Sequence, residues 1–182
     1  MPTLTIPCNF IGDFKVGDNL RYNCDILTKL ADANEDGVLN KPIVLQVGAI
    51  LEAALIQIIY RAQNFKIEGV PNIIEADRKK IEDSKVDKFS VAIDVLRKYG
   101  VINESADMVY DELHMLRRYR NKIHIQEDVR IAGKPRDERI LFSSDLTTRS
   151  LSLNVSILQF LSRELSRPPH IHGYVGDLIV PI

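Results

Sequence analysis

The sequence has few cysteines and no excess of positive charge. Only two of its 182 residues are cysteine, Cys8 and Cys24. At this length one hydrophobic core buries roughly 70% of the surface that the unfolded chain exposes, so the fold needs no disulfide or structural metal. Two cysteines and the lack of an apolar leader predict a reducing, cytoplasmic location. A formal net charge of −1 excludes a uniformly basic nucleic-acid binder but leaves a local basic site open.

The sequence also lacks an uninterrupted apolar run long enough for a membrane span. Its most apolar stretch, residues 43–60, contains Gln46, Glu52 and Gln57. A carboxylate in the middle of a span costs roughly 2.5 to 3.5 kcal/mol in a bilayer. We therefore expect this stretch to be the central core helix of a soluble bundle, with no membrane partner.

Most motifs that mark an enzyme or a cofactor site are missing. No glycine-rich phosphate loop is present, and no Ser, His and Asp combination can be singled out as a triad. His170 and His172 form an HxH pair, but only Asp177 lies nearby, whereas zinc sites need three or four ligands. We expect no cofactor and no metal, and we interpret the two histidines as part of a solvated tail.

One string is similar to the first half of a calcium-binding EF-hand loop. It contains Asp32, Asn34, Asp36 and Gly37, but the twelfth loop position, which should be Glu, is Ile43. A polar turn between two helices, with Gly37 at a positive φ, accounts for the same residues.

Five segments with helical periodicity predict an all-α, single-domain helical bundle of about five helices with short extended terminal arms. The expected core bundle covers residues 18–166, with arms at 1–17 and 167–182. The expected helices run from Asp18 to Ala31, from Pro42 to Phe65, between Asp87 and Gly100, over 105–125 and over 144–166, with a further short exposed helix within 73–88. Gly69 and Pro71 should close the second helix, residues 126–142 should form a loop or loose hairpin, and the ends 3–10 and 177–182 could pair as strands.

The helix expected over 105–125 carries charge on its apolar side. Val109, Leu113, Leu116 and Ile123 fall on one apolar arc, and Arg120 lies within it. An arginine in such a place must be paired, lie at an interface or bind an anion, because an unpaired buried charge is strongly unfavourable.

The residues around Arg120 can be placed in the same way. Arg117 and His124 lie on the edge of the arc, so that both can converge with Arg120, whereas Arg118 points to the opposite side. Glu52 lies among apolar residues in the expected helix over 42–65 and is the preferred partner of Arg120 or His124, with Glu112 as a competitor. A purely structural ion pair is an equally open interpretation of these charges.

The ten residues from Leu116 to Ile125, LRRYRNKIHI, resemble the motif of the HEPN superfamily, the higher eukaryotes and prokaryotes nucleotide-binding domains. That motif is an Arg, four to six further residues and a His, with an Asn often following an Arg. Arg117 and Arg118 satisfy this spacing to His124, whereas Arg120 is only three residues away from it, although Asn121 follows it. The layout of about five helices with the motif late in the bundle is also similar.

This resemblance implies a metal-independent ribonuclease of the bacterial toxin or phage-defence type, active as a homodimer and acting on RNA, with a possible cognate inhibitor protein. It implies that His124 transfers a proton, that Arg117, Arg118 or Arg120 holds the scissile phosphate, and that Asn121 orients one of them. Other members of the superfamily are catalytically silent, so a dimeric interaction module is the alternative.

Overall fold

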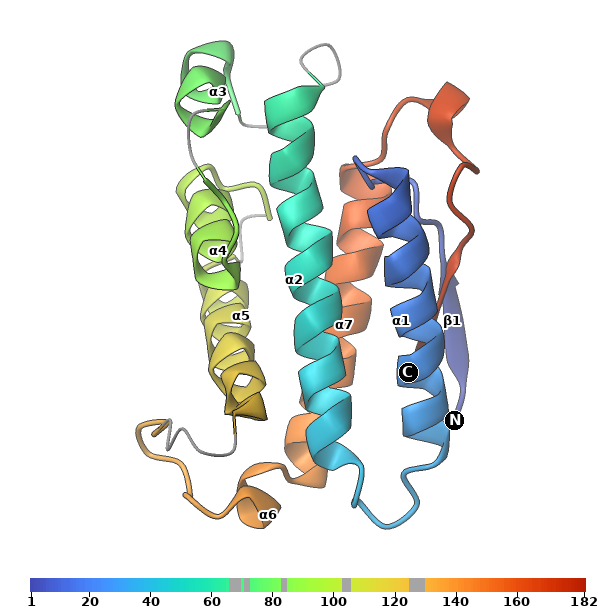
Figure 1. The fold of residues 1–182 in the computed structure, drawn as a ribbon, viewed down its shortest axis with the longest axis vertical. Coiled ribbons are helices and arrows are strands. Elements are labelled where there is room, and N and C mark those ends of the chain that lie inside the picture. Colours follow the sequence, from blue (N-terminus) through green and yellow to red (C-terminus); the bar gives the residue numbers. More distant parts are fainter. Residues whose placement is uncertain (66–69, 71–72, 83–84, 103–105, 125–129) are drawn as a thin grey trace.

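The computed structural model of this chain describes residues 1–65, 70, 73–82, 85–102, 106–124 and 130–182. It is mostly helical, which confirms the all-α bundle (Figure 1). The α-helices are α1 (Phe14–Asp32), α2 (Asn40–Asn64), α3 (Glu75–Glu82), α4 (Phe89–Lys98), α5 (Ala106–Arg120), α6 (Glu138–Leu141) and α7 (Ser144–Glu164). Two 3₁₀ turns, η1 (Asn121–Ile123) and η2 (Pro169–Ile171), and two strands, β1 (Thr3–Ile6) and β2 (Leu178–Pro181), complete the described elements. Gly69 and Pro71, expected to close the second helix, lie outside the described residues.

Helix α2 is the centre of the bundle, as its apolar sequence predicts. It lies between α4 and α5 on one side and α1 and α7 on the other, and it contacts all four (Figure 1). By length and composition alone α2 could cross a membrane, but most of its apolar stretch is buried against these neighbours. Its burial therefore fits a core helix.

Helix α1 begins earlier than the sequence analysis predicts. Asp13, not Asp18, is the N-cap, and its carboxylate accepts hydrogen bonds from the backbone N–H groups of Lys15 and Val16 at 2.9 and 3.4 Å. Residues 14–17, which were predicted to belong to the extended arm 1–17, are therefore part of α1. The predicted buried stripe is confirmed, because Leu20, Cys24, Leu27 and Ala31 are all buried.

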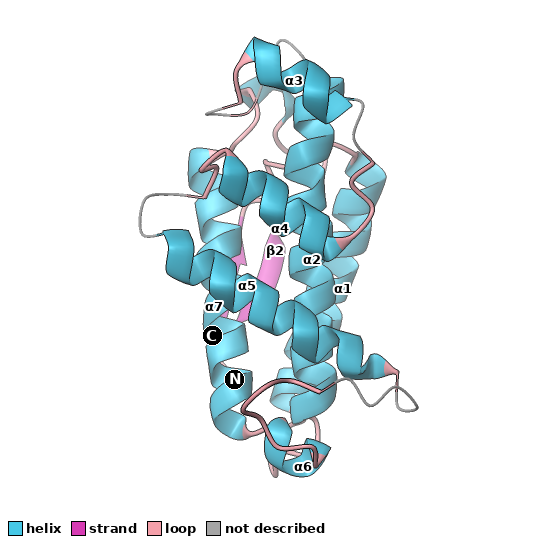
Figure 2. Ribbon diagram, turned by 90° about the vertical axis from the view of Figure 1, so that its left-hand side faces the viewer, coloured by secondary structure: helices cyan, strands magenta, loops and turns pink. Residues whose placement is uncertain are grey.

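The two ends of the chain pair with one another. Strand β1 is antiparallel to β2, with Thr3 opposite Pro181 and Ile6 opposite Leu178. Figure 2, viewed from the side of α4 and α5, shows this small sheet behind the helices, where β2 packs against α1. Ile6, Leu178 and Val180 are buried, so the arms belong to the hydrophobic core.

Helix α5 ends at Arg120, five residues before the predicted end, and the chain continues as the 3₁₀ turn η1. A 3₁₀ turn has three residues per turn instead of 3.6, so it rotates the following side chains out of the helical arc. Ile123 is consequently 59% exposed, and its predicted place on the apolar arc is wrong. Leu113 and Leu116 are buried as predicted.

Candidate functional site

Three hollows surround the end of α5, and the turn η1 sends one residue to each. Because successive side chains of a 3₁₀ turn are about 120° apart, Asn121, Lys122 and Ile123 point in three directions. Asn121 lines a hollow with Arg117, Lys122 lines one with the loop 130–136, and Ile123 lines one with His124. We call these the arginine hollow, the lysine hollow and the histidine hollow.

Arg120 is fixed by an ion pair with α2. Its guanidinium donates a hydrogen bond to the Glu52 carboxylate, which confirms the predicted contact between the two charges. Gly48 makes this approach possible, since a Cβ at that position would lie 2.8 Å from the Cβ of Arg120. The side chain of Glu52 is 16% exposed and that of Arg120 37%, so the pair lies at the edge of the core.

The arginine hollow contains a cation without a partner. It has a volume of about 300 Å³ and is lined by Glu52, Asp87, Lys88, Phe89, Ser90, Arg117, Arg120 and Asn121. The Nε atom of Arg117 is buried and has no hydrogen-bond partner in the described part of the chain. Asp87 is 2.8 Å from Lys85, whose hydrogen bond lowers the pKa of the Asp87 carboxyl. Both carboxylates among the described lining residues are therefore paired, and Arg117 is available to an anion.

The histidine hollow adjoins the same ion pair. It has a volume of about 510 Å³ and is lined by Leu30, Pro42, Leu45, Gln46, Ala49, Arg120, Ile123 and His124. His124 is exposed to solvent. Arg120 thus lines both hollows, whereas Arg117 and His124 line different ones. The predicted convergence of Arg117, Arg120 and His124 on one point is not found, because η1 turns His124 away from the helical arc.

Arg118 is exposed, on the side of α5 opposite to the hollows, as helix geometry predicts. Five hollows are found at the surface formed by residues whose structure is described, and Arg118 lines none of them. Of the two arginines with the family spacing to His124, Arg117 is therefore the one that reaches the candidate site.

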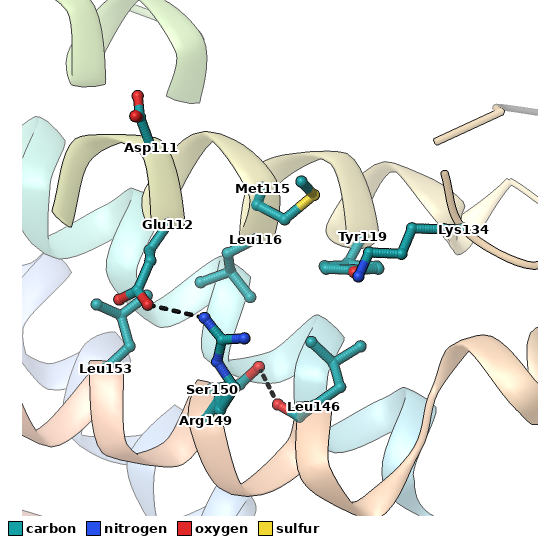
Figure 3. Close-up of a pocket in the computed structure, with 10 residues that line it drawn as sticks. All are labelled: Asp111, Glu112, Met115, Leu116, Tyr119, Lys134, Leu146, Arg149, Ser150 and Leu153. Carbon is teal, nitrogen blue, oxygen red and sulfur yellow. Dashed lines mark hydrogen bonds and ion pairs between the residues drawn. The ribbon is translucent and has the colours of Figure 1, made fainter. Parts of the chain in front are cut away.

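A separate groove lies between α5 and α7 (Figure 3). Its volume is about 260 Å³, and Met115, Leu116, Leu146 and Leu153 form its apolar part. Glu112 accepts a hydrogen bond from Arg149 at 3.0 Å across this groove (Figure 3). Glu112 is thus engaged by α7, and it is not the partner of Arg120.

The calcium-like string forms a hydrogen-bonded turn between α1 and α2. Asn34 Oδ1 accepts from the backbone N–H of Leu39 at 2.8 Å, and Asp36 Oδ1 accepts from that of Val38 at 3.1 Å. Gly37 has a φ of 81°, which confirms the predicted turn. No group of three or more His, Cys, Asp or Glu side chains within the described ranges could hold a metal ion.

The tail histidines are exposed, as predicted. His170 lies in η2, and a ring nitrogen of His172 is 2.5 Å from the carbonyl oxygen of Arg167. Figure 1 shows η2 at the upper end of the molecule, whereas α5 ends near the lower end, so these histidines are far from the hollows at the end of α5.

Three structural features carry no signal in the sequence: the burial of Lys122, the burial of Arg61 and Arg167, and the close approach at Gly48. Lys122 is only 5% exposed although it follows the motif residue Asn121, and Arg61 and Arg167 are fully enclosed in the core. Lysine and arginine are rarely buried, and no periodic pattern marks these positions, because their surroundings come from distant segments. Gly48 shares the face of Glu52, and only the crossing of α5 shows why it must lack a side chain.

In comparisons with known proteins, no family model, no curated protein and no solved structure matches the chain.

Proposed function

We propose that this protein binds RNA across the arginine and histidine hollows and cleaves it without a metal ion. The observation that carries the proposal is the position of Arg120. It is held by Glu52 between two adjoining hollows, one presenting the unpartnered Arg117 and the other the exposed His124. A phosphodiester and its ribose need such a cation and a proton-transfer group side by side.

Each hollow suits a different part of an RNA strand. The arginine hollow is polar and offers the guanidinium of Arg117 and the amide of Asn121 to phosphate oxygens. The histidine hollow has apolar walls at Leu30, Leu45 and Ile123, which suit the face of a base or ribose. RNA lying over Arg120 would therefore place a phosphate beside a ribose within reach of His124.

The cleavage step uses the 2′-hydroxyl of the RNA as the nucleophile. The imidazole of His124 takes the hydroxyl proton while the 2′-oxygen forms a bond to phosphorus. The bond from phosphorus to the 5′-oxygen breaks, and the leaving oxygen takes up a proton from solvent or from a second motif. Arg117 and Arg120 stabilise the negative charge that develops on the phosphate oxygens.

We propose a homodimer as the active assembly. Ile123 is 59% exposed on the rim of the histidine hollow, beside the exposed Ala49. A second copy related by a two-fold axis would cover these apolar atoms and bring two motifs to one cleft. A toxin or phage-defence role, with a cognate inhibitor protein that covers the cleft, is the biological setting we propose for this activity.

The second candidate is a catalytically silent dimeric module. The ion pair between Glu52 and Arg120 favours it, since this contact ties α2 to α5 whether or not RNA binds. In that case His124 would have no role in chemistry, and the exposed apolar rim would serve as the functional surface.

The test is incubation of the purified protein with mixed RNA in the presence of EDTA. We expect His124→Ala to lower the cleavage rate about 10²- to 10⁴-fold, the usual contribution of a general acid or base, with an unchanged circular dichroism spectrum. His170→Ala, which removes an exposed histidine far from the hollows, is the matched control and should cleave as the wild type does. Arg117→Ala should weaken RNA binding, and light scattering should show a dimer at micromolar concentration.

One result would favour the silent module instead: a wild-type protein that does not cleave RNA and whose RNA binding is unchanged by Arg117→Ala and His124→Ala. Cleavage that EDTA abolishes would contradict the metal-independent mechanism, and it would contradict the silent module as well.

A further inference from the structure

The groove between α5 and α7, which we call the α5–α7 groove, combines an apolar middle with a polar end. Its apolar part is formed by Met115 and Leu116 of α5 and by Leu146 and Leu153 of α7. Leu116 is buried, and the other three are half-buried. The volume of about 260 Å³ is just below the roughly 300–1,000 Å³ of sites for drug-sized ligands, so the groove has room for a smaller molecule.

Both acidic side chains that line the α5–α7 groove have basic partners. Asp111 is 3.0 Å from Arg97 of α4, and Glu112 is 3.0 Å from Arg149 of α7. Lys134, in contrast, forms no ion pair with any residue that the structure describes, and its ammonium group lies beside Tyr119 at one end of the groove (Figure 3). Among the described lining residues, the charge at this end is therefore positive, which favours an anionic group.

Tyr119 provides a second polar group at the same end. It is 4% exposed, and its ring packs edge-on against Phe142 with the ring centroids 6.1 Å apart. The hydroxyl of a buried tyrosine usually has a hydrogen-bond partner. That of Tyr110, for example, donates to the carbonyl oxygen of Leu96 at 2.8 Å. The Tyr119 hydroxyl makes no hydrogen bond within the described ranges of the chain, so it is available to a ligand in the groove that Tyr119 lines.

We propose that the α5–α7 groove binds a small amphipathic carboxylate. Its apolar body would lie against Leu116, Leu146 and Leu153, and its carboxylate would bind at Tyr119 and Lys134. A carboxylate has two acceptor oxygens, so one can accept a hydrogen bond from the hydroxyl and the other from the ammonium group. The groove shares no lining residue with the arginine hollow or the histidine hollow, so this proposal does not depend on RNA cleavage.

The experiment is an NMR titration of the ¹⁵N-labelled full chain with sodium hexanoate, against sodium chloride at equal ionic strength. We expect saturable shifts of the amides in 111–119, 130–136 and 146–153, with a dissociation constant of about 1 mM. Sodium butanoate has two fewer CH₂ groups and should bind about 15-fold more weakly, because each buried CH₂ raises affinity about fourfold. 1-Hexanol, which lacks the charge, should bind several-fold more weakly than hexanoate.

Two variants remove the polar ligands one at a time. Tyr119→Phe removes only the hydroxyl and keeps the ring against Phe142, and Lys134→Met removes a charge at an exposed position, so both should keep the circular dichroism spectrum of the wild type. Each should weaken hexanoate binding several-fold, and Lys134→Met should leave 1-hexanol binding unchanged. Tyr22→Phe and Lys29→Met are the matched controls, at exposed positions of α1 on the other side of α2, and they should bind hexanoate as the wild type does (Figure 1).

The proposal is overturned if hexanoate causes no saturable shifts in these three segments, or if Tyr119→Phe or Lys134→Met binds hexanoate as tightly as the wild type. It is also overturned if butanoate or 1-hexanol binds the wild type as tightly as hexanoate does, since the groove would then recognise no apolar body or no carboxylate.

Two further outcomes separate this proposal from others. Shifts of the same amides that depend on protein concentration without any ligand would identify a second copy of the chain as the occupant and would overturn the carboxylate site. If the wild type does not cleave RNA but binds hexanoate through Tyr119 and Lys134, the proposed function fails and the carboxylate site stands.

Discussion

Two pairs of arginines in this protein differ in how deeply they are buried and in what surrounds them. Arg61 and Arg167 are 3% and 6% exposed, and each donates hydrogen bonds to backbone carbonyl groups of residues 10–12 or 165. Arg117 and Arg120 lie at the end of α5, where one has no described partner and the other shares a carboxylate at the protein surface. The deeper pair thus has a structural role, and the shallower pair is the one available to a ligand.

The difference shows that burial alone does not identify a functional charge. Arg167 donates to the carbonyl oxygens of Ile11 and Gly12 at 3.0 and 3.2 Å, and its guanidinium lies 4.2 Å from the ring centroid of Phe65. These contacts close the region formed by residues 6–12 and 165–180, which we call the terminal region. The two arginine pairs differ in their surroundings: Arg61 and Arg167 donate to backbone carbonyl groups inside the core, whereas Arg117 and Arg120 line a hollow at the surface.

The largest effect is expected in the terminal region. Arg167→Ala removes two charge-assisted hydrogen bonds, leaves two carbonyl groups unsatisfied, and should lower the free energy of unfolding by about 3 kcal/mol. Urea denaturation of the wild type and the variant measures this change in the free energy of unfolding. Arg163→Ala is the control, because Arg163 is 74% exposed and should change stability by less than about 0.5 kcal/mol. Equal effects of the two variants would show that the terminal region is not held by Arg167.

The two thiols test how tightly the core is closed at Cys8, in the terminal region, and at Cys24, in α1. Burial, together with the charge of Cys24, raises the pKa of Cys8 from 9.0 to about 12, and burial raises that of Cys24 to about 12. Above pH 9 the unfolded chain therefore loses thiol protons that the folded chain retains, so the free energy of unfolding falls as the pH rises. From pH 8 to about 10 the loss should reach about 1.4 kcal/mol per thiol.

Urea denaturation at these pH values compares the wild type with the double variant Cys8→Ala, Cys24→Ala. The variant should show the flatter pH dependence, because other groups that titrate in this range are common to both proteins. Parallel pH profiles would mean that the thiols are accessible to solvent in the folded protein.

A smaller effect is expected at the ion pair of the candidate site. Arg120→Ala should destabilise the protein by about 1–2 kcal/mol, since Glu52 loses its counter-charge at a mostly enclosed position. A double-mutant cycle with Glu52→Ala should give a coupling energy of about 1 kcal/mol, because Arg120 is partly exposed to water.

The pair formed by Glu112 and Arg149 is the matched control for that cycle. Arg149 is 74% exposed, so its coupling energy should be below about 0.5 kcal/mol. If the coupling energy of Glu52 and Arg120 is no larger than that of Glu112 and Arg149, the ion pair does not hold Arg120 in position.

The smallest effect on stability is expected from Arg118→Ala, at less than about 0.5 kcal/mol, because the side chain is exposed. The same variant should cleave RNA as the wild type does, whereas Arg117→Ala should not. Both variants are measured side by side. If Arg118→Ala loses cleavage, the functional arginine is the one that the direction of the helix face argues against, and motif spacing is the better guide.

The sequence by itself determined the long helices and their buried faces, but not the short helix α6 (Glu138–Leu141), which lies within 126–142, where a loop or loose hairpin was expected. Apolar spacing located the central helix, the stripe of Leu20, Cys24 and Leu27, and the opposite directions of Arg118 and Arg120, because these depend only on the 3.6-residue period. The contact between Glu52 and Arg120 was predictable for the same reason, since each was a single charge on an apolar face. The start of α1 was missed because two aspartates, Asp13 and Asp18, could serve as its N-cap.

Only the tertiary structure decided what lies around the end of α5. The 3₁₀ turn after Arg120 rotates Ile123 to the surface, encloses Lys122 and separates His124 from Arg117, and a continuous helical period cannot anticipate such a change of pitch. The partners of Arg61 and Arg167 are likewise set by the tertiary structure, because they come from residues 51 to 156 positions away along the chain. Local periodicity specifies which face of a helix is apolar, but the surroundings of a buried cation depend on segments that only folding brings together.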